Sequence, residues 1–340
     1  MKGKTPLPKR YIMGLDGGGT KTVCAIADTD GNIIGYGRGG PANTHFVKWE
    51  IGISSFDKAI QEALVSANLG AKPALDAICI GSPTPKDVYL PVLEKQIVFR
   101  GPLITAGEAR AALASAHTQP WGLVIVAGTG SFAWLKTRDG REHIIGGWGA
   151  LLGDEGSAYW IGREGIKAAI RAHDHRGPET TLTQAIMDVL ELSDLRQLIW
   201  EVYRGNLKYR HQVAALSPVV AAEAAEGDIV ARDILHRAAY ELSLLATSCA
   251  TALNAQHEVL PCVLSGGVFA AEELIIKPLE AFLQESLPNV TILPNRAPQI
   301  VGSCAIALSE LGIKLTDALL SKLQCEIEKA QSQYSANHSH

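Results

Sequence analysis

The chain has 340 residues, of which 47% are hydrophobic and 19% are charged, and its formal net charge is −4. At roughly 100–200 residues per domain, this length favours two globular domains with substantial cores. The acidic balance excludes electrostatic binding of nucleic acid, and the lack of any run of about 18 apolar residues excludes a membrane span.

The first ten residues are basic and contain prolines. The apolar run that follows, residues 11–15, is too short for the hydrophobic region of a signal peptide. We therefore expect a cytoplasmic protein that has neither a membrane nor a nucleic acid as partner.

The first motif is "DGGGTKT", residues 16–22, which has the composition of a phosphate-binding loop. The Walker pattern fails because Thr20 separates Gly19 from Lys21, and the dinucleotide-binding pattern fails because Thr22 replaces its last glycine. The residues that follow are β-branched and apolar, and Asp30-Gly31 closes them with a hairpin signal. The glycines are therefore predicted to join strand to strand rather than strand to helix.

The same pattern returns at residues 123–150, which read "LVIVAGTGSFAWLKTRDGREHIIGGWGA". Each copy holds an apolar strand, a glycine-rich turn, a second strand, an Asp-Gly turn and a third strand that ends in glycines. A repeat of this length indicates one supersecondary unit used twice. We therefore predict an α/β fold of two similar domains, residues 1–118 and 119–313, with the boundary at the helix-breaking "HTQPWG".

Additional strands are expected in both domains. Short apolar runs at 77–81 and 102–105 predict parallel strands in the first domain, and runs at 262–267 and 290–293 predict them in the second.

The second domain is also predicted to carry a helical insertion, because residues 161–254 are almost wholly helical in pattern. Its clearest amphipathic segments are 180–192 and 228–253. A last helix at about 314–332 is expected to pack back on the first domain, followed by a disordered tail.

Two glycine turns, one in each domain, have the composition to bind a polyphosphate between the domains. Glycine lets a ligand approach the backbone closely, so that N–H groups can donate to phosphate oxygens. Each turn alone could be an ordinary hairpin, but their paired occurrence favours binding. A third turn follows a predicted strand and either meets a ligand such as adenosine or simply connects strand to helix. The turns consist of Gly17, Gly18, Gly19 and Thr20, of Gly128, Thr129, Gly130 and Ser131, and of Ser265, Gly266 and Gly267.

Asp16 ends the first predicted strand just before its glycine turn. A carboxylate beside phosphates would be repelled unless a cation lay between them. Asp16 is therefore predicted to serve a Mg²⁺ site, directly or through water. Lys21 either offsets phosphate charge or is a solvated strand residue.

The densest polar cluster is "GGWGALLGDEGSAYW", residues 146–160. A capped helix start explains part of it, but not two carboxylates, Asp154 and Glu155, near Trp148. Carboxylates accept hydrogen bonds from hydroxyls and aromatic rings cover C–H faces, so this composition suits a sugar. Asn43-Thr44-His45 is another polar cluster, which either caps a helix or reaches the same substrate.

Taken together, "DGGGTKT", "AGTGS", "GGWG…GDEGSAYW" and "LSGGV" resemble the actin-like ATPase superfamily that includes sugar kinases. Within it, the chain is most similar to the N-acetylglucosamine and glucosamine kinases, relatives of the BadF/BadG-type ATPases. The likeness covers nearly the whole chain, and the "GGWG…GDEGSAYW" block is its most specific part. It implies two actin-like, ribonuclease H-like domains with a cleft between them, which close over ATP, Mg²⁺ and a hexose.

The resemblance implies in-line phosphoryl transfer from ATP to a hydroxyl, usually the 6-hydroxyl, of an amino sugar such as N-acetylglucosamine or glucosamine. It also implies site residues: Asn43 and Asp154 for sugar hydroxyls, Trp148 and Gly149 for the pocket wall, and Asp16 for Mg²⁺.

The family's catalytic base is an aspartate, but "ITAGEARAALASA" places Glu108 at the matching position. Its side chain is one methylene longer, and misplacement by about 1 Å can cost on the order of 10²-fold in rate. Either the backbone accommodates Glu108, or the substrate differs, or kinase activity is weak. Glu108 could also be a surface glutamate that opens a helix near its positive end.

Two alternatives to a kinase stay open at this point. One is a BadF-type activator of 2-hydroxyacyl-CoA dehydratases, which carries an iron–sulfur cluster; the six scattered cysteines form no C-x-x-C pair and argue against it. The other is an actin-fold sugar sensor that has lost turnover. For any of these proteins we expect a homodimer, since cyclic dimers are the commonest oligomers.

Overall fold

The structure is a computed structural model that describes residues 9–44, 47–205, 207–294 and 297–337. The chain divides into two compact units, residues 1–120 with 294–340, and residues 121–293. His45 of the predicted polar cluster lies outside the described residues.

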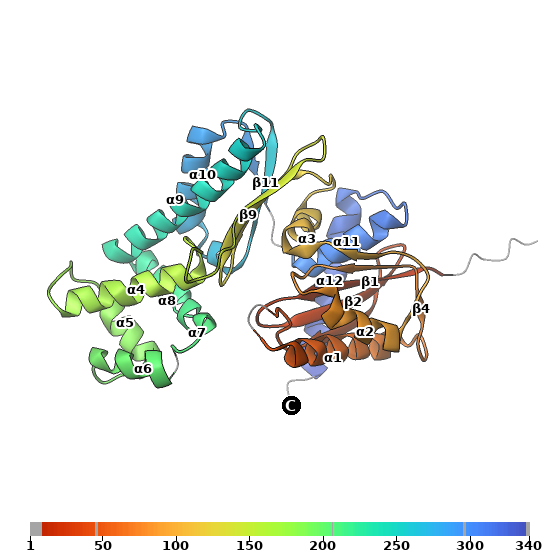
Figure 1. Ribbon diagram of the computed structural model, residues 1–340, viewed down its shortest axis with the longest axis horizontal. Coiled ribbons are helices and arrows are strands. Elements are labelled where there is room, and N and C mark those ends of the chain that lie inside the picture. Colours follow the sequence, from red (N-terminus) through yellow and green to blue (C-terminus); the bar gives the residue numbers. More distant parts are fainter. Residues whose placement is uncertain (1–8, 45–46, 206, 295–296, 338–340) are drawn as a thin grey trace, which may run out of the picture. The chain divides into compact units, whose positions relative to one another are not determined.

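The first unit is built on a mixed five-stranded sheet with the strand order β3-β2-β1-β5-β7 (Figure 1). The strands β1, β2 and β3 form an antiparallel meander, while β1, β5 and β7 are parallel. Two short parallel strands, β4 (Ala74–Leu75) and β6 (Val98–Phe99), were not predicted and form a separate small sheet. The other elements are β1 (Tyr11–Gly17), β2 (Thr22–Asp28), β3 (Ile33–Gly39), α1 (Trp49–Ala67), β5 (Ala77–Ile80), α2 (Lys86–Gln96), β7 (Leu103–Thr105), α3 (Gly107–Ala116), α11 (Gln299–Glu310) and α12 (Asp317–Asn337).

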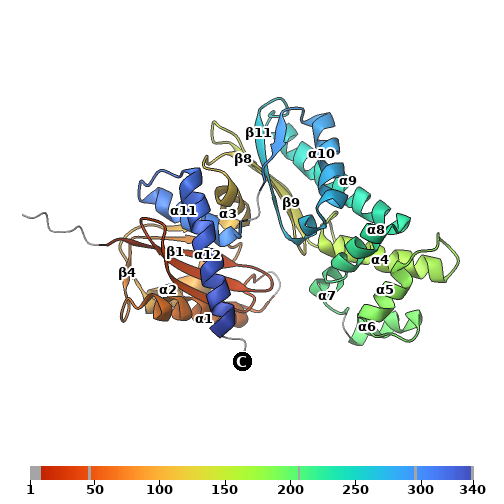
Figure 2. The same ribbon diagram turned by 180° about the vertical axis from the view of Figure 1, so that it is seen from behind.

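Helices cover both faces of this sheet, with α1 and α2 on one face and α11 and α12 on the other (Figures 1 and 2). Successive strand residues point to opposite faces. Met13 and Leu15 accordingly lie in the core under α1 and α2, whereas Ile12 lies in the core under α11 and α12. Both sets of side chains are fully buried, which explains why β1 reads as a continuous apolar run.

The helix α1 lies unusually close to the edge strand β3. Added β-carbons at Gly35, Gly37 and Gly39 would lie only 2.0–2.3 Å from carbonyl oxygens of α1. These glycines alternate along the strand, so all three point to one face, and they meet carbonyls spaced four residues apart along one side of the helix. The glycines at the end of the first meander therefore have a packing role.

The second unit repeats the arrangement with the strand order β10-β9-β8-β11-β12. Again the first three strands form an antiparallel meander and β8, β11 and β12 are parallel. Helices of the predicted insertion extend from one side of it (Figure 1). The elements are β8 (Gly122–Ala127), β9 (Ser131–Lys136), β10 (Glu142–Gly146), α4 (Ala158–His173), α5 (Leu182–Val189), η1 (Leu195–Gln197), α6 (Leu198–Arg204), α7 (Arg210–Ala214), α8 (Ser217–Glu226), α9 (Ile229–Ala252), β11 (Leu260–Ser265), η2 (Gly267–Ala271), α10 (Glu273–Ser286) and β12 (Val290–Ile292).

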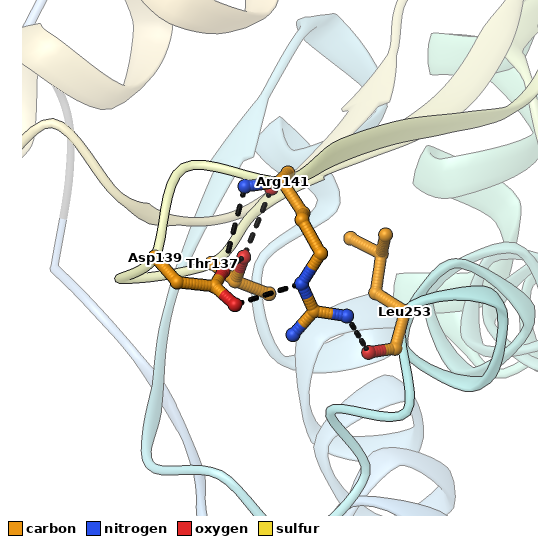
Figure 3. Close-up of polar contacts among 4 residues, drawn as sticks. All are labelled: Thr137, Asp139, Arg141 and Leu253. Atoms are coloured by element: carbon orange, nitrogen blue, oxygen red, sulfur yellow. Dashed lines mark hydrogen bonds and ion pairs between the residues drawn. The ribbon is translucent and has the colours of Figure 1, made fainter.

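The Asp-Gly turn of the second meander also anchors the long helix α9. Asp139 accepts hydrogen bonds from the Thr137 hydroxyl and, at 2.8 Å, from Nε of Arg141 (Figure 3). Arg141 in turn donates to the carbonyl oxygen of Leu253 at 2.7 Å, at the C-terminal end of α9, where a cation is favourable. The hydrogen bonds from Thr137 and Arg141 lower the pKa of Asp139 to about 2.

The domain to which the chain after residue 293 belongs differs from the predicted one. The predicted second domain ran to residue 313, but residues 294–340 cluster with the first unit, where α11 packs on α3, β1 and β5. The last helix also continues to Asn337, beyond the predicted end at 332, because Tyr334 donates to Glu62 of α1 at 2.7 Å and so holds its last turns on the first unit. Among the described helices, none is long and apolar enough to cross a membrane.

Candidate active site

The first glycine turn joins β1 to β2 as a tight hairpin. The pairs Asp16–Val23 and Gly17–Thr22 end the ladder, and the Gly18 N–H donates to the Lys21 carbonyl at 2.9 Å. The prediction that these glycines join strand to strand is therefore confirmed. An added β-carbon at Gly17 would lie 2.8 Å from the Phe56 ring, so only glycine fits there.

A second loop, residues 40–43, is fixed against this turn. The carbonyl oxygen of Gly18 accepts hydrogen bonds from the backbone N–H groups of Ala42 at 3.0 Å and Asn43 at 3.1 Å. The hydroxyl of Thr84 holds the same loop from the other side through the Ala42 carbonyl, at 2.8 Å. Asn43, one of the predicted sugar-binding residues, is thereby held at the first glycine turn and is only 7% exposed.

Glu108 lies at the same edge of the sheet as Asp16. The strands β1, β5 and β7 are parallel, so their carboxyl ends meet, and Glu108 begins helix α3 just after β7. Both residues are half-buried. This edge of the first unit thus brings together Asp16, Glu108, Asn43 and the exposed turn residues Gly19, Thr20 and Lys21.

Both carboxyl groups have raised pKa values, and Glu108 contributes to that of Asp16. Burial, followed by the negative charge of Glu108, raises the pKa of Asp16 to about 7, and nearby Lys21 offsets only part of this. Burial also raises the pKa of Glu108, against a hydrogen bond from Gln299 that lowers it. Since burial and a neighbouring carboxylate both disfavour the ionised form of Asp16, a cation bound at this edge would stabilise that form.

The composition of this edge fits Mg²⁺. That ion takes oxygen ligands and commonly uses one or two carboxylates together with waters and substrate phosphates. Among the described residues, no group of three or more His, Cys, Asp or Glu side chains is placed to hold a metal. A site made by Asp16 with phosphate oxygens and water is compatible with both observations.

The second and third glycine turns lie against each other in the second unit. The second turn is closed by the Gly128 N–H, which donates to the Gly130 carbonyl at 2.9 Å. Gly266, with φ at +114°, is so close to it that an added β-carbon would lie 2.4 Å from the Ala127 carbonyl oxygen. Ser265 pairs with Val126 in the adjacent strands. The glycine turns at the carboxyl ends of β8 and β11 are therefore in close backbone contact.

Asp154 is held against the second glycine turn. It has a left-handed backbone, with φ at +61°, and a side chain only 3% exposed. Its Oδ1 accepts from the Ser131 N–H at 3.4 Å, and a β-carbon on Gly130 would lie 2.7 Å from its Oδ2. The Ser131 hydroxyl locks the same loop by donating to the Glu155 carbonyl at 2.7 Å.

The buried Asp154 carboxylate lacks a hydrogen-bond donor at Oδ2 among the described protein atoms. A guanidinium nitrogen of Arg210, in helix α7, lies 3.8 Å from this oxygen. Burial raises the pKa of Asp154, and the Ser131 N–H, the Arg210 guanidinium and the Gly149 backbone N–H counteract this only in part. A buried acceptor without a donor is costly, so a ligand hydroxyl that donated to Oδ2 would bind favourably.

The helix predicted to start after Asp154 is present as α4. The loop that precedes Asp154 is exposed. Ser157 caps helix α4 by accepting from the Trp160 N–H. Trp148, predicted to form a pocket wall, is 73% exposed, and the carbonyl of Gly149 accepts from the Leu152 and Gly153 N–H groups.

Two residues in these sites were missed by the sequence interpretation. Arg210 lies in a short helix of the insertion and belongs to no motif, so only its distance to Asp154 reveals it. Gln299 contacts Glu108 from a helix 191 positions later in the chain, and no local pattern could have revealed that contact.

Comparison with protein families matches residues 13–305 to the BadF/BadG/BcrA/BcrD ATPase family. This match spans far more than half of the chain. The chain belongs to the BadF/BadG/BcrA/BcrD ATPase family. This membership and the paired mixed sheets confirm the predicted resemblance and the predicted fold of two actin-like α/β domains.

Relatives of this ATPase-family chain are similar over nearly their whole length. An N-acetylmuramic acid/N-acetylglucosamine kinase of Clostridium acetobutylicum is 31% identical, over 88% of this chain and 99% of the relative. An N-acetyl-D-glucosamine kinase of Dictyostelium discoideum is 28% identical, over 89% and 99%. A solved structure from Chromobacterium violaceum, provisionally assigned as an N-acetylglucosamine kinase, has a TM-score of 0.69 at 26% identity, over 88% of this chain and 99% of that chain.

Proposed function

We propose that this chain is an ATP-dependent kinase that phosphorylates a hydroxyl, the 6-hydroxyl, of an amino sugar such as N-acetylglucosamine or glucosamine. The observation that carries the proposal is the pair of half-buried acidic residues, Asp16 and Glu108, at the carboxyl edge of one sheet beside a glycine hairpin. Such an edge can supply both the base and the metal ligand that phosphoryl transfer requires. The names of the relatives support the same substrate class.

Glu108 is the proposed general base. As the sugar hydroxyl oxygen forms its bond to the γ-phosphorus of ATP, the hydroxyl proton passes to the Glu108 carboxylate. The bond between the γ-phosphorus and the β,γ-bridging oxygen breaks, and ADP leaves with that electron pair. Burial raises the pKa of Glu108, which makes it a better proton acceptor than an exposed glutamate while it stays ionised.

Asp16 is the proposed ligand of Mg²⁺, directly or through a water. When bound, the ion would neutralise negative charge on the phosphates. The N–H groups of Gly18, Gly128 and Ser131 already donate to protein oxygens. The remaining backbone N–H groups of the turns 17–20 and 128–131 are proposed to donate to phosphate oxygens, and Ser265–Gly267 to meet the nucleoside. Lys21 is exposed at the first turn and can add positive charge there.

Asp154 and Asn43 are proposed to bind sugar hydroxyls. Oδ2 of Asp154 is buried without a hydrogen-bond donor from the described residues, which is the state expected of a group that a substrate hydroxyl satisfies. Trp148 and Gly149 are proposed to form the wall of the pocket, with the exposed indole ring available to cover a sugar face. We also propose a cytoplasmic location for this reaction and a homodimer as the oligomeric state.

The test is a coupled assay of ADP release with Mg²⁺-ATP and one sugar at a time. The sugars are glucosamine, N-acetylglucosamine, N-acetylmannosamine, N-acetylmuramate and glucose, and mass spectrometry identifies the phosphorylated product. Turnover with an amino sugar that exceeds turnover with glucose supports the proposal. ADP release that no sugar stimulates would contradict it. A brown protein with iron–sulfur absorbance would favour the dehydratase activator, and sugar-dependent thermal stabilisation without turnover would favour the sensor.

A further inference from the structure

The side-chain amide of a residue from a distant part of the chain holds Glu108. Nε2 of Gln299 donates to Oε1 of Glu108 at 3.3 Å, although the two residues are 191 positions apart. Gln299 is the first residue of α11 and follows Pro298, while Glu108 lies in the first turn of α3. The contact therefore joins the N-terminal turns of two helices of the first unit.

The position of Gln299 is fixed by close packing of the two helices. A β-carbon on Gly302 would lie 1.7 Å from the Ala111 carbonyl oxygen and 2.9 Å from the Ser115 backbone nitrogen. Residues three apart lie on the same side of a helix, so Gln299 and Gly302 share one side of α11, and Glu108 and Ala111 share one side of α3. The backbone contact at Gly302 sets the register that brings Gln299 to Glu108.

The same helix also supports the strand that carries Asp16. The Ser303 hydroxyl donates to the Leu15 carbonyl at 3.1 Å. A β-carbon on Gly14 would lie 3.0 Å from the Cys304 backbone nitrogen, so α11 and β1 are in close contact. One helix thus determines the position of Glu108 relative to the end of β1, where Asp16 lies.

An amide donor suits this position chemically. It is neutral, so it can fix one carboxyl oxygen without the strong loss of basicity that a Lys or Arg partner would cause. The second carboxyl oxygen stays able to accept a proton. A glutamate also has one more rotatable bond than an aspartate, and a bond to Oε1 restricts the added freedom.

Resting on the proposed function, we propose that Gln299 is the positioning residue of Glu108. It holds the carboxylate so that the longer side chain presents its second oxygen to the sugar hydroxyl. Loss of the amide leaves substrate binding intact and makes the productive orientation of Glu108 less frequent.

The test compares Gln299→Ala with Gln324→Ala in the full chain. Gln324 donates to Glu328 at 2.9 Å on the exposed side of α12, so its variant removes a similar bond far from the site. Gln299→Ala is expected to lower kcat about 10- to 100-fold, the range that slight misplacement of a reacting group produces, while KM for ATP and for the sugar changes less than about twofold. Gln324→Ala should leave both constants and the thermal midpoint unchanged, and Gln299→Ala should leave the midpoint within a few degrees.

A double-mutant cycle separates positioning from a general structural effect. In a Glu108→Gln background, Gln299→Ala should lower the residual rate by less than about twofold, because the group it positions is already disabled. An equal loss of kcat in both backgrounds, an unchanged kcat in the single variant, or a rise in KM that accounts for the whole loss would overturn the proposal. If the unaltered protein shows no sugar-stimulated turnover, the proposed function fails and the role of Gln299 fails with it.

Discussion

Gly130 and Asp154 are in direct contact: a β-carbon at position 130 would lie 2.7 Å from Oδ2 and 3.0 Å from Cγ of the Asp154 carboxyl group. Asp154 is almost fully buried and also accepts from the Ser131 N–H of the same turn. The second glycine turn therefore determines where the Asp154 carboxyl group, proposed to bind sugar, can lie. The same turn is also proposed to bind phosphate. Gly128 and Gly130 of this turn are consequently expected to have different roles.

Alanine at these two glycines should produce different kinetic defects. Gly130→Ala should displace the Asp154 carboxyl group and raise KM for the sugar about 5- to 150-fold, since a misplaced polar contact costs about 1–3 kcal/mol. Gly128→Ala places its β-carbon in open space and should instead raise KM for ATP, because the added carbon blocks close approach of phosphate. Steady-state kinetics with each substrate varied separately measures both effects. Equal changes in the two KM values for both variants would contradict this assignment.

Asp16 should make the protein less stable as the pH rises. The pKa of Asp16 is raised in the folded state to about 7 from an ordinary value of 3.8, so between these pH values the folded state binds more protons than the unfolded state. The free energy of unfolding therefore falls as the pH rises through that window. Asp16→Asn has no carboxyl group to ionise at this position, so it lacks this fall in the free energy of unfolding. Its thermal midpoint should be close to that of the unaltered protein at pH 4 and higher than that of the unaltered protein at pH 8.

Thermal melts at pH 4 to 8 in the presence of a chelator measure this effect, with Asp30→Asn in an exposed turn as the control. In the presence of ADP at pH 8, adding Mg²⁺ should raise the midpoint of the unaltered protein more than that of Asp16→Asn. A midpoint for Asp16→Asn that lies below that of the unaltered protein at pH 8 would refute the electrostatic account.

Arg210 should be required for the stability of the second unit while Asp154 is ionised. Removing one partner of a buried ion pair leaves the other charge uncompensated, which costs about 3–5 kcal/mol for a fully buried pair. Arg210 is partly exposed and its guanidinium lies 3.8 Å from Asp154, so Arg210→Met should cost less, about 1–3 kcal/mol. Urea denaturation at pH 7.5 measures the loss. Asp154→Asn in the same chain should recover part of it.

The matched control is Lys277→Met, which breaks the exposed pair with Glu273. Exposed pairs contribute about 0–1 kcal/mol, so this variant should be nearly neutral. If Arg210→Met is equally neutral, the guanidinium does not compensate the Asp154 charge.

The meander repeat and its turns could be predicted because their signals are local. Glycines followed by β-branched residues and an Asp-Gly turn specify antiparallel strands within about 25 residues, and both copies folded accordingly. The parallel strands β5 and β11 were predictable for a similar reason, since short apolar runs between helical segments mark them. The two-residue strands β4 and β6 are too short to leave such a signal.

The placement of α11 could not be predicted, because it depends on contacts between residues far apart in the chain. Gly302 fits against Ala111 of α3, and nothing in the local pattern distinguishes this glycine from an ordinary helix interruption. For the same reason Gln299 and Arg210 were absent from the predicted site, whereas Asp16 and Asp154 were identified from the motifs around them. The roles of the predicted site residues remain predictions for the experiments above.

The most direct test of the central claim is the turnover of Glu108→Gln beside the unaltered protein, with the preferred amino sugar and Mg²⁺-ATP. If Glu108 accepts the hydroxyl proton, kcat should fall about 10²- to 10⁴-fold, the contribution typical of a general base, with both KM values within about threefold. Glu108→Asp should retain more activity than Glu108→Gln because it keeps a carboxylate. Turnover of Glu108→Gln at the rate of the unaltered protein would contradict the claim and move the base to another residue.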